Sequence, residues 1–177
     1  MEKAIYVITG VMASGKSTIA EALARRLDKC VHLRGDVFRK MIVTGREEMC
    51  ECPTIEALNQ LDMRYSITAK TAMEYYNNGF SVVVQDNFIG EKLSYFVNLL
   101  KEYPIYVIVL NPDVKTIAQR EQKRGKKGYV GFTVESLHNI FMEETPKVGL
   151  WLDTTNMSVE ETVNEILTRA NNEAKYK

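Results

Sequence analysis

Residues 10–17 read Gly-Val-Met-Ala-Ser-Gly-Lys-Ser, a complete G-x-x-x-x-G-K-S pattern between a hydrophobic run and an amphipathic segment. Glycines at both ends of this phosphate-binding loop let the backbone curl, so that consecutive N–H groups point at phosphate oxygens. We expect Lys16 to bridge the β- and γ-phosphates of a nucleotide, and the Ser17 hydroxyl to bind Mg²⁺. A glycine-rich turn that binds nothing is the alternative, but a Lys-Ser pair has no packing role at a helix start. The predicted nucleotide-binding residues are Gly10, Ala13, Ser14, Gly15, Lys16, Ser17 and Thr18.

Short hydrophobic runs alternate with longer segments of helical periodicity along the chain. The runs, rich in Val, Ile and Tyr, predict five strands at residues 4–8, 30–33, 80–85, 105–110 and 149–152. The other segments predict helices at residues 18–27, 55–78, 92–101, 113–124, 134–144 and 159–174. Strands that alternate with helices form a mostly parallel sheet with helices on both faces, so we expect a three-layer α/β/α fold.

Composition limits the kind of protein and its surroundings. The chain has 177 residues, of which 45% are hydrophobic and 26% charged, values typical of one globular domain. Lysine and arginine total 23, and aspartate and glutamate also total 23, so no net charge attracts nucleic acid or an anionic membrane. Three cysteines, with no secretory leader and no long apolar run, predict a cytoplasmic protein that does not span a membrane.

A carboxylate and a guanidinium follow the second predicted strand, in the sequence Arg34-Gly-Asp36-Val-Phe-Arg39. Asp36 and Arg39 are three residues apart and share one face if the turn continues as a helix. In an open α/β sheet the ligand lies beyond the carboxyl ends of the strands, which places this pair beside the phosphate-binding loop. We expect Asp36 to accept the proton of an acceptor hydroxyl, and Arg39 to orient the acceptor or the carboxylate. A surface ion pair is the alternative.

Further charged residues extend this predicted site. Asp86 follows the third strand, where it holds either Mg²⁺ or the acceptor, with a turn-capping role as the alternative. Arg120 and Arg124 lie one helical turn apart, just before a segment from Gly125 to Gly131 that resembles a lid. Guanidinium groups on a closing lid neutralise the charge of a transferring phosphoryl group and exclude water. A solvated basic helix end is the competing interpretation.

The phosphate-binding loop, Asp36, the arginine-bearing lid and the segment Leu152-Asp153-Thr154-Thr155 together resemble the P-loop small-molecule kinases, and in particular the chloramphenicol phosphotransferase-like group. The resemblance implies one kinase domain over residues 1–177, with a five-stranded parallel sheet, a helical lid at about 120–132 and an acceptor-side insertion at about 40–78. It further implies ATP-dependent phosphorylation of a hydroxyl, with Mg²⁺, Asp36 as the base, and Thr155 near the adenine. The strand ends offer no Asn-Lys-x-Asp segment that reads guanine, which favours ATP.

Local sequence also bears on the acceptor. The Asp36-x-x-Arg39 spacing is similar to that of polynucleotide 5′-kinases and zeta-toxin-type kinases. Residues 46–62, however, contain five acidic residues against Arg46 alone, and an acidic surface repels a polynucleotide. We therefore expect a neutral or cationic hydroxyl-bearing small molecule, with Arg64 contributing to its pocket. Two alternatives stand beside this prediction: a polynucleotide 5′-hydroxyl kinase or zeta-toxin-like kinase, and a non-catalytic nucleotide-binding regulator. The sequence leaves the oligomeric state open.

Overall fold

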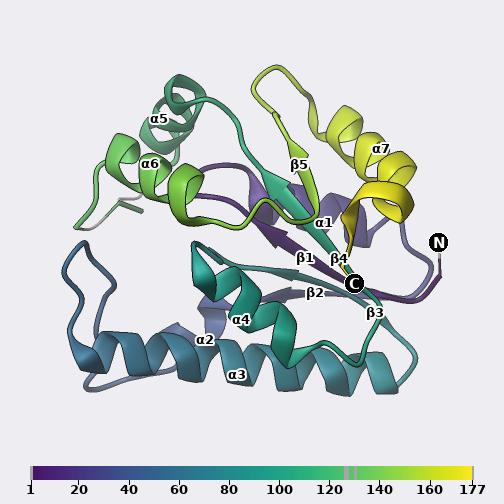
Figure 1. Ribbon diagram of the computed structural model, residues 1–177, viewed down its shortest axis with the longest axis horizontal. Coiled ribbons are helices and arrows are strands. Elements are labelled where there is room, and N and C mark those ends of the chain that lie inside the picture. Colours follow the sequence, from purple (N-terminus) through teal and green to yellow (C-terminus); the bar gives the residue numbers. More distant parts are fainter. Residues whose placement is uncertain (1, 126–127, 130, 177) are drawn as a thin grey trace.

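A twisted, mostly parallel β-sheet forms the centre of the computed structural model, which describes residues 2–125, 128–129 and 131–176 (Figure 1). Five parallel strands follow the order β2-β3-β1-β4-β5, and the short strand β6 pairs with β4 in the antiparallel direction. The strands are β1 (Ile5–Thr9), β2 (Cys30–Arg34), β3 (Ser81–Gln85), β4 (Ile105–Leu110), β5 (Leu150–Leu152) and β6 (Lys175–Tyr176).

Helices cover both faces of the sheet, which confirms the expected three-layer α/β/α fold (Figure 1). Side chains of α3, α4 and α6 pack on one face, and side chains of α1 and α7 pack on the other. The helices are α1 (Lys16–Ala24), α2 (Asp36–Lys40), α3 (Ile55–Asn77), α4 (Glu91–Leu99), α5 (Val114–Lys123), α6 (Val134–Glu144) and α7 (Val159–Arg169).

Residues of the central strands alternate between the two faces of the sheet. In β1, Ile5 and Val7 join the cluster under α3 and α4, whereas Tyr6 and Ile8 join the cluster under α1 and α7. The rings of Tyr6 and Tyr106 stack on this second face with centroids 5.2 Å apart. Both faces are buried, which explains why the strands appear in the sequence as continuous hydrophobic runs.

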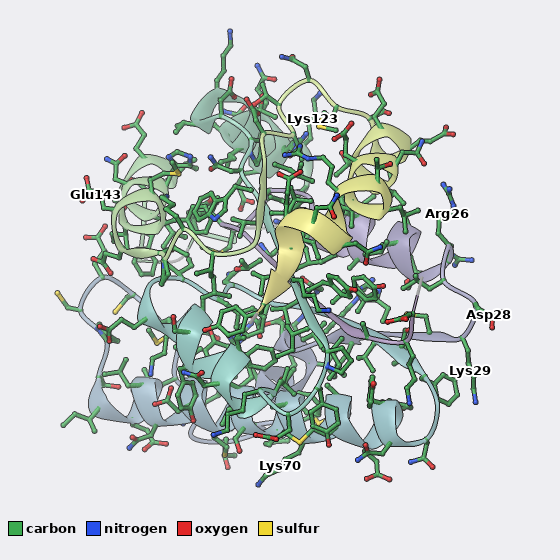
Figure 2. All side chains as sticks on the ribbon, turned by 45° about the vertical axis from the view of Figure 1, so that its right-hand side comes forward. Arg26, Asp28, Lys29, Lys70, Lys123 and Glu143 are labelled. Atoms are coloured by element: carbon green, nitrogen blue, oxygen red, sulfur yellow. The ribbon has the colours of Figure 1, made fainter. Side chains whose placement is uncertain are left out.

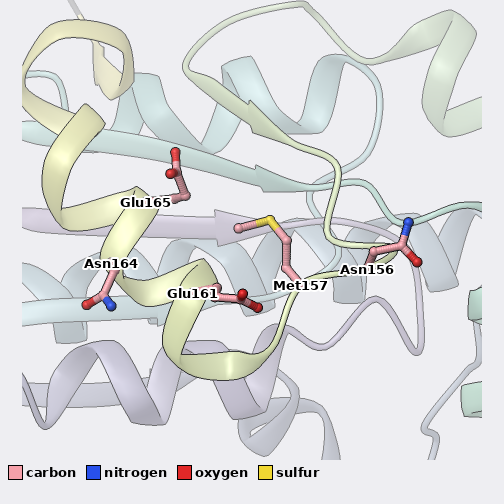
Figure 3. Close-up of a pocket in the computed structure, with 5 residues that line it drawn as sticks. All are labelled: Asn156, Met157, Glu161, Asn164 and Glu165. Atoms are coloured by element: carbon pink, nitrogen blue, oxygen red, sulfur yellow. The ribbon is translucent and has the colours of Figure 1, made fainter.

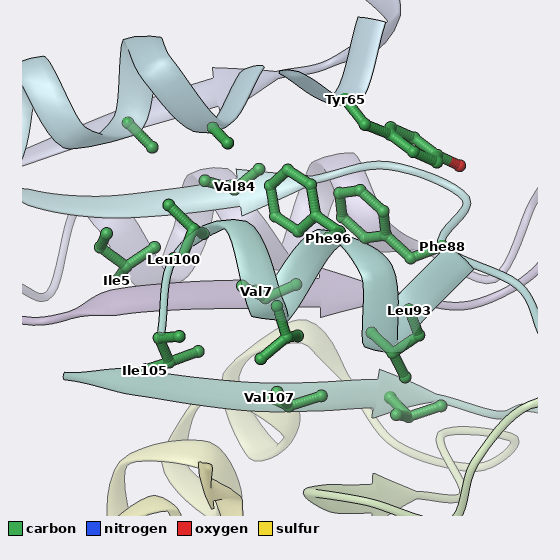
Figure 4. Packing of buried hydrophobic residues seen from close by; sticks show 14 of the residues in the cluster. Ile5, Val7, Tyr65, Val84, Phe88, Leu93, Phe96, Leu100, Ile105 and Val107 are labelled. Carbon is green, nitrogen blue, oxygen red and sulfur yellow. The ribbon is translucent and has the colours of Figure 1, made fainter. Parts of the chain in front are cut away.

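Three aromatic rings fix α3 and α4 over the carboxyl end of β3 (Figure 4). Phe88 stacks on Phe96 with centroids 4.1 Å apart, and Tyr65 contacts Phe88 at 5.0 Å and Phe96 at 6.0 Å. The Tyr65 hydroxyl donates a hydrogen bond of 2.8 Å to the carbonyl of Asn87. This packing holds the start of the β3–α4 loop, and with it Asp86, in a fixed position.

Charged side chains lie on the outside of the molecule, where Arg26, Asp28, Lys29, Lys70 and Glu143 are exposed (Figure 2). In the part of the chain that the structure describes, no helix has both the length and the apolar character needed to cross a membrane.

The end of the chain differs from the sequence prediction of one helix over residues 159–174. The α-helix α7 ends at Arg169 and continues as a π-helix, η1 (Ala170–Ala174), which leads into β6. Ala170 and Ala174 are fully buried against the second face of the sheet. β6 thus adds a strand to the five that the sequence predicts, because a two-residue strand has no hydrophobic alternation to reveal it.

We expect Phe96→Ala to lower the free energy of unfolding by about 3–5 kcal/mol, because it leaves a cavity between Tyr65 and Phe88. Phe96 is fully buried, whereas its neighbour Tyr95 is 38% exposed and serves as the control. Tyr95→Ala should change the free energy by less than about 1 kcal/mol. Urea unfolding followed by circular dichroism measures both, and equal effects would contradict this description of the core.

Candidate active site

The phosphate-binding loop joins β1 to α1 through backbone conformations that L side chains rarely adopt. Gly10, Ala13 and Gly15 have φ values of 147°, 62° and 102°. A Cβ on Gly10 would lie 2.5 Å from the carbonyl oxygen of Leu110, so only glycine fits there. Gly15 is the N-cap of α1 and has no side chain to accept hydrogen bonds from the first turn. The amides of Lys16 and Ser17 have no hydrogen-bond acceptor among the described residues and are therefore available to an anion.

Lys16 lies at the start of α1 with its side chain folded back over the loop. Its Nζ donates hydrogen bonds of 2.9 Å to the carbonyl of Gly10 and 2.7 Å to that of Val11. Burial lowers the pKa of Lys16 to about 7, although the nearby Asp86 carboxylate opposes the shift. A phosphate in place of the two carbonyls would raise this pKa again and so favour the charged ammonium form of Lys16.

Asp36 is the first residue of α2 and accepts two charged hydrogen bonds on its own helix. Arg39 Nε lies 2.9 Å from one carboxylate oxygen, and Lys40 Nζ lies 2.6 Å from the other. Burial alone would raise the pKa of Asp36, but these two cations hold it below its ordinary value. Arg39 also pairs with Glu48. The predicted Asp36–Arg39 pair thus exists, and it joins α2 to the loop before α3.

Asp86 lies just beyond β3 and is 5% exposed. Its Oδ1 accepts hydrogen bonds of 3.1 Å from Arg64 and 2.7 Å from the backbone N–H of Asn87. Its Oδ2 is buried without a hydrogen-bond partner in the described part of the chain. Burial raises the pKa of Asp86, although the Arg64 guanidinium beside it opposes the shift. The pair brings the predicted residues Arg64 and Asp86 together.

Gly35 allows the Asp86 carboxylate to approach the β2–α2 turn. A Cβ on Gly35 would lie 2.2 Å from Asp86 Oδ2, and the backbone there has an ordinary φ of −60°. The glycine is therefore needed for space rather than for backbone freedom. This contact sets the two carboxylates, Asp36 and Asp86, on neighbouring strand ends.

Arg120 and Arg124 take different partners. Arg120 donates hydrogen bonds of 3.1 Å to the carbonyl of Ser14 and 3.2 Å to that of Thr154, so it links α5 to the phosphate-binding loop. Arg124 pairs with Glu121 at 3.4 Å and is half exposed. The two arginines come from one side of α5, but Arg120 alone is bonded to the loop.

The lid contacts both the phosphate-binding loop and the acceptor-side insertion. The Tyr129 hydroxyl donates a hydrogen bond of 2.7 Å to the carbonyl of Met12. The carbonyl of Gly131 accepts a hydrogen bond of 3.3 Å from the N–H of Glu51, and a Cβ on Gly131 would lie 2.5 Å from that of Cys50. The lysines of the predicted lid, residues 126–127, lie outside the described residues.

These elements surround one cavity of about 1200 Å³. The predicted site residues that line it are Ala13, Ser14, Gly15, Lys16, Ser17, Thr18, Asp36, Arg39, Arg64, Asp86, Arg120 and Arg124. Gly10 and Thr155 are not among its lining residues. Gly10 instead shapes the loop, and the Thr155 hydroxyl accepts a hydrogen bond of 2.8 Å from the N–H of Asp113 while Thr154 lines the cavity.

The expectation of an acidic acceptor side is wrong for the cavity wall. Of the five acidic residues between positions 46 and 62, Glu48 alone is among the described residues that line the cavity. Glu47 bonds to Thr54, Glu56 bonds to Gln60, and Asp62 pairs with Lys92. A count of charges along the sequence does not show where each side chain points. These three carboxylates bond to other protein side chains instead of lining the cavity.

Sequence reasoning missed several cavity residues. Arg34 and Lys40 flank Asp36 in the sequence, and their proximity to it was the available signal. Lys92 reaches the cavity from α4, and the sequence carries no signal for it.

A smaller hollow of about 310 Å³ lies beside α7 (Figure 3). Its lining residues are Asn156, Met157, Glu161, Asn164 and Glu165. Glu161 completes the capping box of α7 with Ser158, and Glu165 pairs with Arg169 at 3.4 Å. Both carboxylates that line this hollow are therefore already bonded to other residues of α7 or its N-cap.

A parallel sheet of order β2-β3-β1-β4-β5, with a phosphate-binding loop after β1 and Arg120 of α5 bonded to that loop, defines the P-loop kinase fold. The chain belongs to the AAA domain family, whose sequence model matches residues 5–139. A search of curated protein sequences finds no match.

Solved structures share this fold over nearly their whole length. The tunicamycin resistance protein of Deinococcus radiodurans is 13% identical, with a TM-score of 0.73 and 99% of both chains covered. The APS kinase of Mycobacterium tuberculosis, in complex with AMPPNP and APS, is 15% identical, with a TM-score of 0.71 and coverage of 94% of this chain and 96% of that chain. A sugar kinase from Janibacter sp. is 17% identical, with a TM-score of 0.67 and 94% of both chains covered. The expected resemblance is thereby confirmed in the fold.

We expect Gly35→Ala to lower the free energy of unfolding by about 1–3 kcal/mol, because the new methyl group collides with Asp86 Oδ2. Urea unfolding measures this change. The control is the same substitution in an Asp86→Ala background, where the collision is absent and the effect should fall by at least about 1 kcal/mol. Equal effects in the two backgrounds would show that Gly35 is not needed for the approach of Asp86.

Proposed function

We propose that the protein is a cytoplasmic, Mg·ATP-dependent kinase that transfers the γ-phosphoryl group of ATP to a hydroxyl of a small molecule. The observation that carries this proposal is a single cavity of about 1200 Å³, lined by the phosphate-binding loop and by the carboxylates of Asp36 and Asp86. Ligand pockets commonly measure about 300–1,000 Å³. The cavity therefore has room for a nucleotide and an acceptor together.

The phosphate-binding loop holds the nucleotide. The free amides at the start of α1 bind phosphate oxygens, and Lys16 exchanges the carbonyls of Gly10 and Val11 for the β- and γ-phosphates. Arg120, bonded to the carbonyls of Ser14 and Thr154, sets a guanidinium beside the loop, and Arg124 adds a second positive charge nearby. These cations stabilise negative charge on the transferring group.

The oxygen ligands that Mg²⁺ prefers are present in the same cavity. The Ser17 hydroxyl and the Asp86 carboxylate both line it, and Asp86 Oδ2 is buried without a partner among the described residues. Mg²⁺ is usually held by one or two protein oxygens together with phosphates and water. The described residues gather no group of three or more His, Cys, Asp or Glu side chains, which agrees with such a mixed site. When bound, the ion neutralises phosphate charge.

Asp36 is the base that acts on the acceptor hydroxyl. Its pairs with Arg39 and Lys40 keep the carboxylate ionised at neutral pH and fix its direction. The acceptor oxygen attacks the γ-phosphorus, the bond from that phosphorus to the β–γ bridging oxygen breaks, and ADP leaves with the electron pair. Asp36 accepts the proton that the hydroxyl loses, so the products are ADP and a phosphate monoester.

A polynucleotide 5′-hydroxyl kinase is the second candidate, and the basic lining of the cavity favours it. Among the described residues, nine basic side chains line the cavity against three acidic ones. Binding of a polynucleotide through phosphate contacts weakens steeply with salt, whereas binding of a small acceptor does so far less. The salt dependence of binding to a 5′-hydroxyl oligonucleotide therefore separates the two candidates.

We expect Asp36→Asn to lower the turnover number by about 10²–10⁴-fold while the affinity for Mg·ATP stays within about twofold, because the base is lost and the nucleotide site is not. ADP release is measured with Mg·ATP and a panel of hydroxyl-bearing small molecules and 5′-hydroxyl oligonucleotides. The control is Asp28→Asn, the same change on an exposed turn. Unchanged turnover in Asp36→Asn would exclude Asp36 as the base, and nucleotide binding without turnover on any acceptor would favour a regulator.

The pKa of Lys16 predicts proton uptake on nucleotide binding. Burial lowers this pKa to about 7 in the free protein, so in most molecules the Lys16 side chain is a neutral amine at pH 8. Binding of Mg·ADP should therefore take up about 0.9 proton at pH 8 and about 0.1 at pH 6. Calorimetry in two buffers of different ionisation enthalpy measures the uptake. A binding enthalpy that is independent of the buffer at pH 8 would show that Lys16 is already charged.

A further inference from the structure

Basic residues are concentrated in the cavity although the whole chain has no net charge. Four of the nine basic residues belong to the nucleotide side, because they lie on the phosphate-binding loop or on α5. The other five come from β2, α2, α3 and α4. The nine are Lys16, Arg120, Lys123 and Arg124 on the nucleotide side, and Arg34, Arg39, Lys40, Arg64 and Lys92 on the acceptor side.

Among the described residues, Arg34 is the one cation of the acceptor side that has no ion pair. Arg39 and Lys40 bond to Asp36, Arg64 bonds to Asp86, and Lys92 bonds to Asp62 at 2.5 Å. Arg34, at the carboxyl end of β2, is exposed, lines the cavity and has no ion pair with any residue that the structure describes. An exposed cation without an ion pair has capacity for an anionic group.

Arg64 also lines the cavity, where it is paired with Asp86. The Arg64 side chain is 11% exposed, and its Nε is buried without a hydrogen-bond partner in the described chain. Asp86 Oδ2 is likewise buried, beside Gly35, so the Arg64–Asp86 pair is a fixed and internally neutralised part of the cavity lining.

Apolar side chains complete the acceptor side of the cavity. Those that line it are Met49, Leu58, Leu61, Ile89, Phe132, Leu137 and Ile140, from the insertion, the β3–α4 loop, the lid and α6. The contact between Glu51 and Gly131 joins the insertion to the lid. A small ligand with an apolar body fits this enclosure better than an extended polymer does.

We propose that the acceptor is a small amphipathic molecule with a hydroxyl, an apolar body and an anionic group, which is a carboxylate, a sulfate or sulfonate, or a phosphate or phosphonate. This inference rests on the proposed function. Arg34 binds the anionic group, Asp36 accepts the proton of the hydroxyl, and the apolar lining covers the body. This charge class differs from the neutral or cationic acceptor that the acidic insertion suggested.

Calorimetric binding to the protein saturated with Mg·AMPPNP tests the charge class on a matched series. The series has the formula PhCH(OH)CH₂X, with X a carboxylate, sulfonate, phosphonate, carboxamide or ammonium group. Gluconate and gluconamide give a second, polar pair. We expect at least one anionic member to bind about tenfold or more tighter than its neutral partner, and the ammonium compound to bind most weakly.

Arg34→Gln tests the residue that carries the inference. It should weaken binding of the tightest anionic compound about tenfold, leave the carboxamide and AMPPNP affinities within about twofold, and be partly rescued by Arg34→Lys. The control is Arg26→Gln, the same change on the exposed surface (Figure 2). Equal affinity of anionic and neutral members, preference for the ammonium compound, or absence of binding by every anionic member up to 10 mM would overturn the inference. So would tighter, salt-sensitive binding of a 5′-hydroxyl oligonucleotide.

Replacement of AMPPNP by ATP separates this inference from the proposed function. An anionic compound that binds but is not phosphorylated would contradict the kinase proposal and leave the anion site standing. Phosphorylation of the neutral member with the higher efficiency would support the kinase proposal and overturn the anion site.

Discussion

The tight backbone turn between β1 and α1 is the constraint on which the rest of the site depends. Gly10 lies against the carbonyl of Leu110 at the end of β4, so the loop is packed directly onto the neighbouring strand. The left-handed residues Ala13 and Gly15 then direct the chain into a helix whose first amides are free. Lys16 and Arg120 take their positions from this turn, because both donate hydrogen bonds to its carbonyls.

Buried charge organises the opposite wall of the cavity. Asp86 lies in a dry position beside Arg64, and the aromatic packing of Tyr65 under the β3–α4 loop holds it there. Gly35 lets this carboxylate reach the β2–α2 turn. Asp86 Oδ2 and Arg64 Nε are buried without hydrogen-bond partners among the described residues, which costs free energy. The same wall therefore combines rigidity with capacity for a ligand.

The sequence predicts the fold well because its strongest signals are local. Continuous runs such as residues 105–110 mark buried parallel strands, and the spacing from Gly10 to Ser17 fixes the loop chemistry. Asp36 and Asp86 are found because strand ends meet at one edge of the sheet. The sequence misleads where side-chain direction matters. Glu47, Glu56 and Asp62 turn to local partners, and Lys92 arrives from α4 by tertiary packing alone. Thr154 lines the cavity in place of Thr155 for the same reason.

We propose that Lys16 exchanges its hydrogen bonds to the phosphate-binding loop for bonds to nucleotide phosphates. A crystal structure with Mg·AMPPNP tests this exchange directly. We predict that the triphosphate lies against the amides of residues 13–18, and that Lys16 Nζ has left the carbonyls of Gly10 and Val11 for phosphate oxygens. A nucleotide bound elsewhere, with Lys16 still on those carbonyls, would contradict the account.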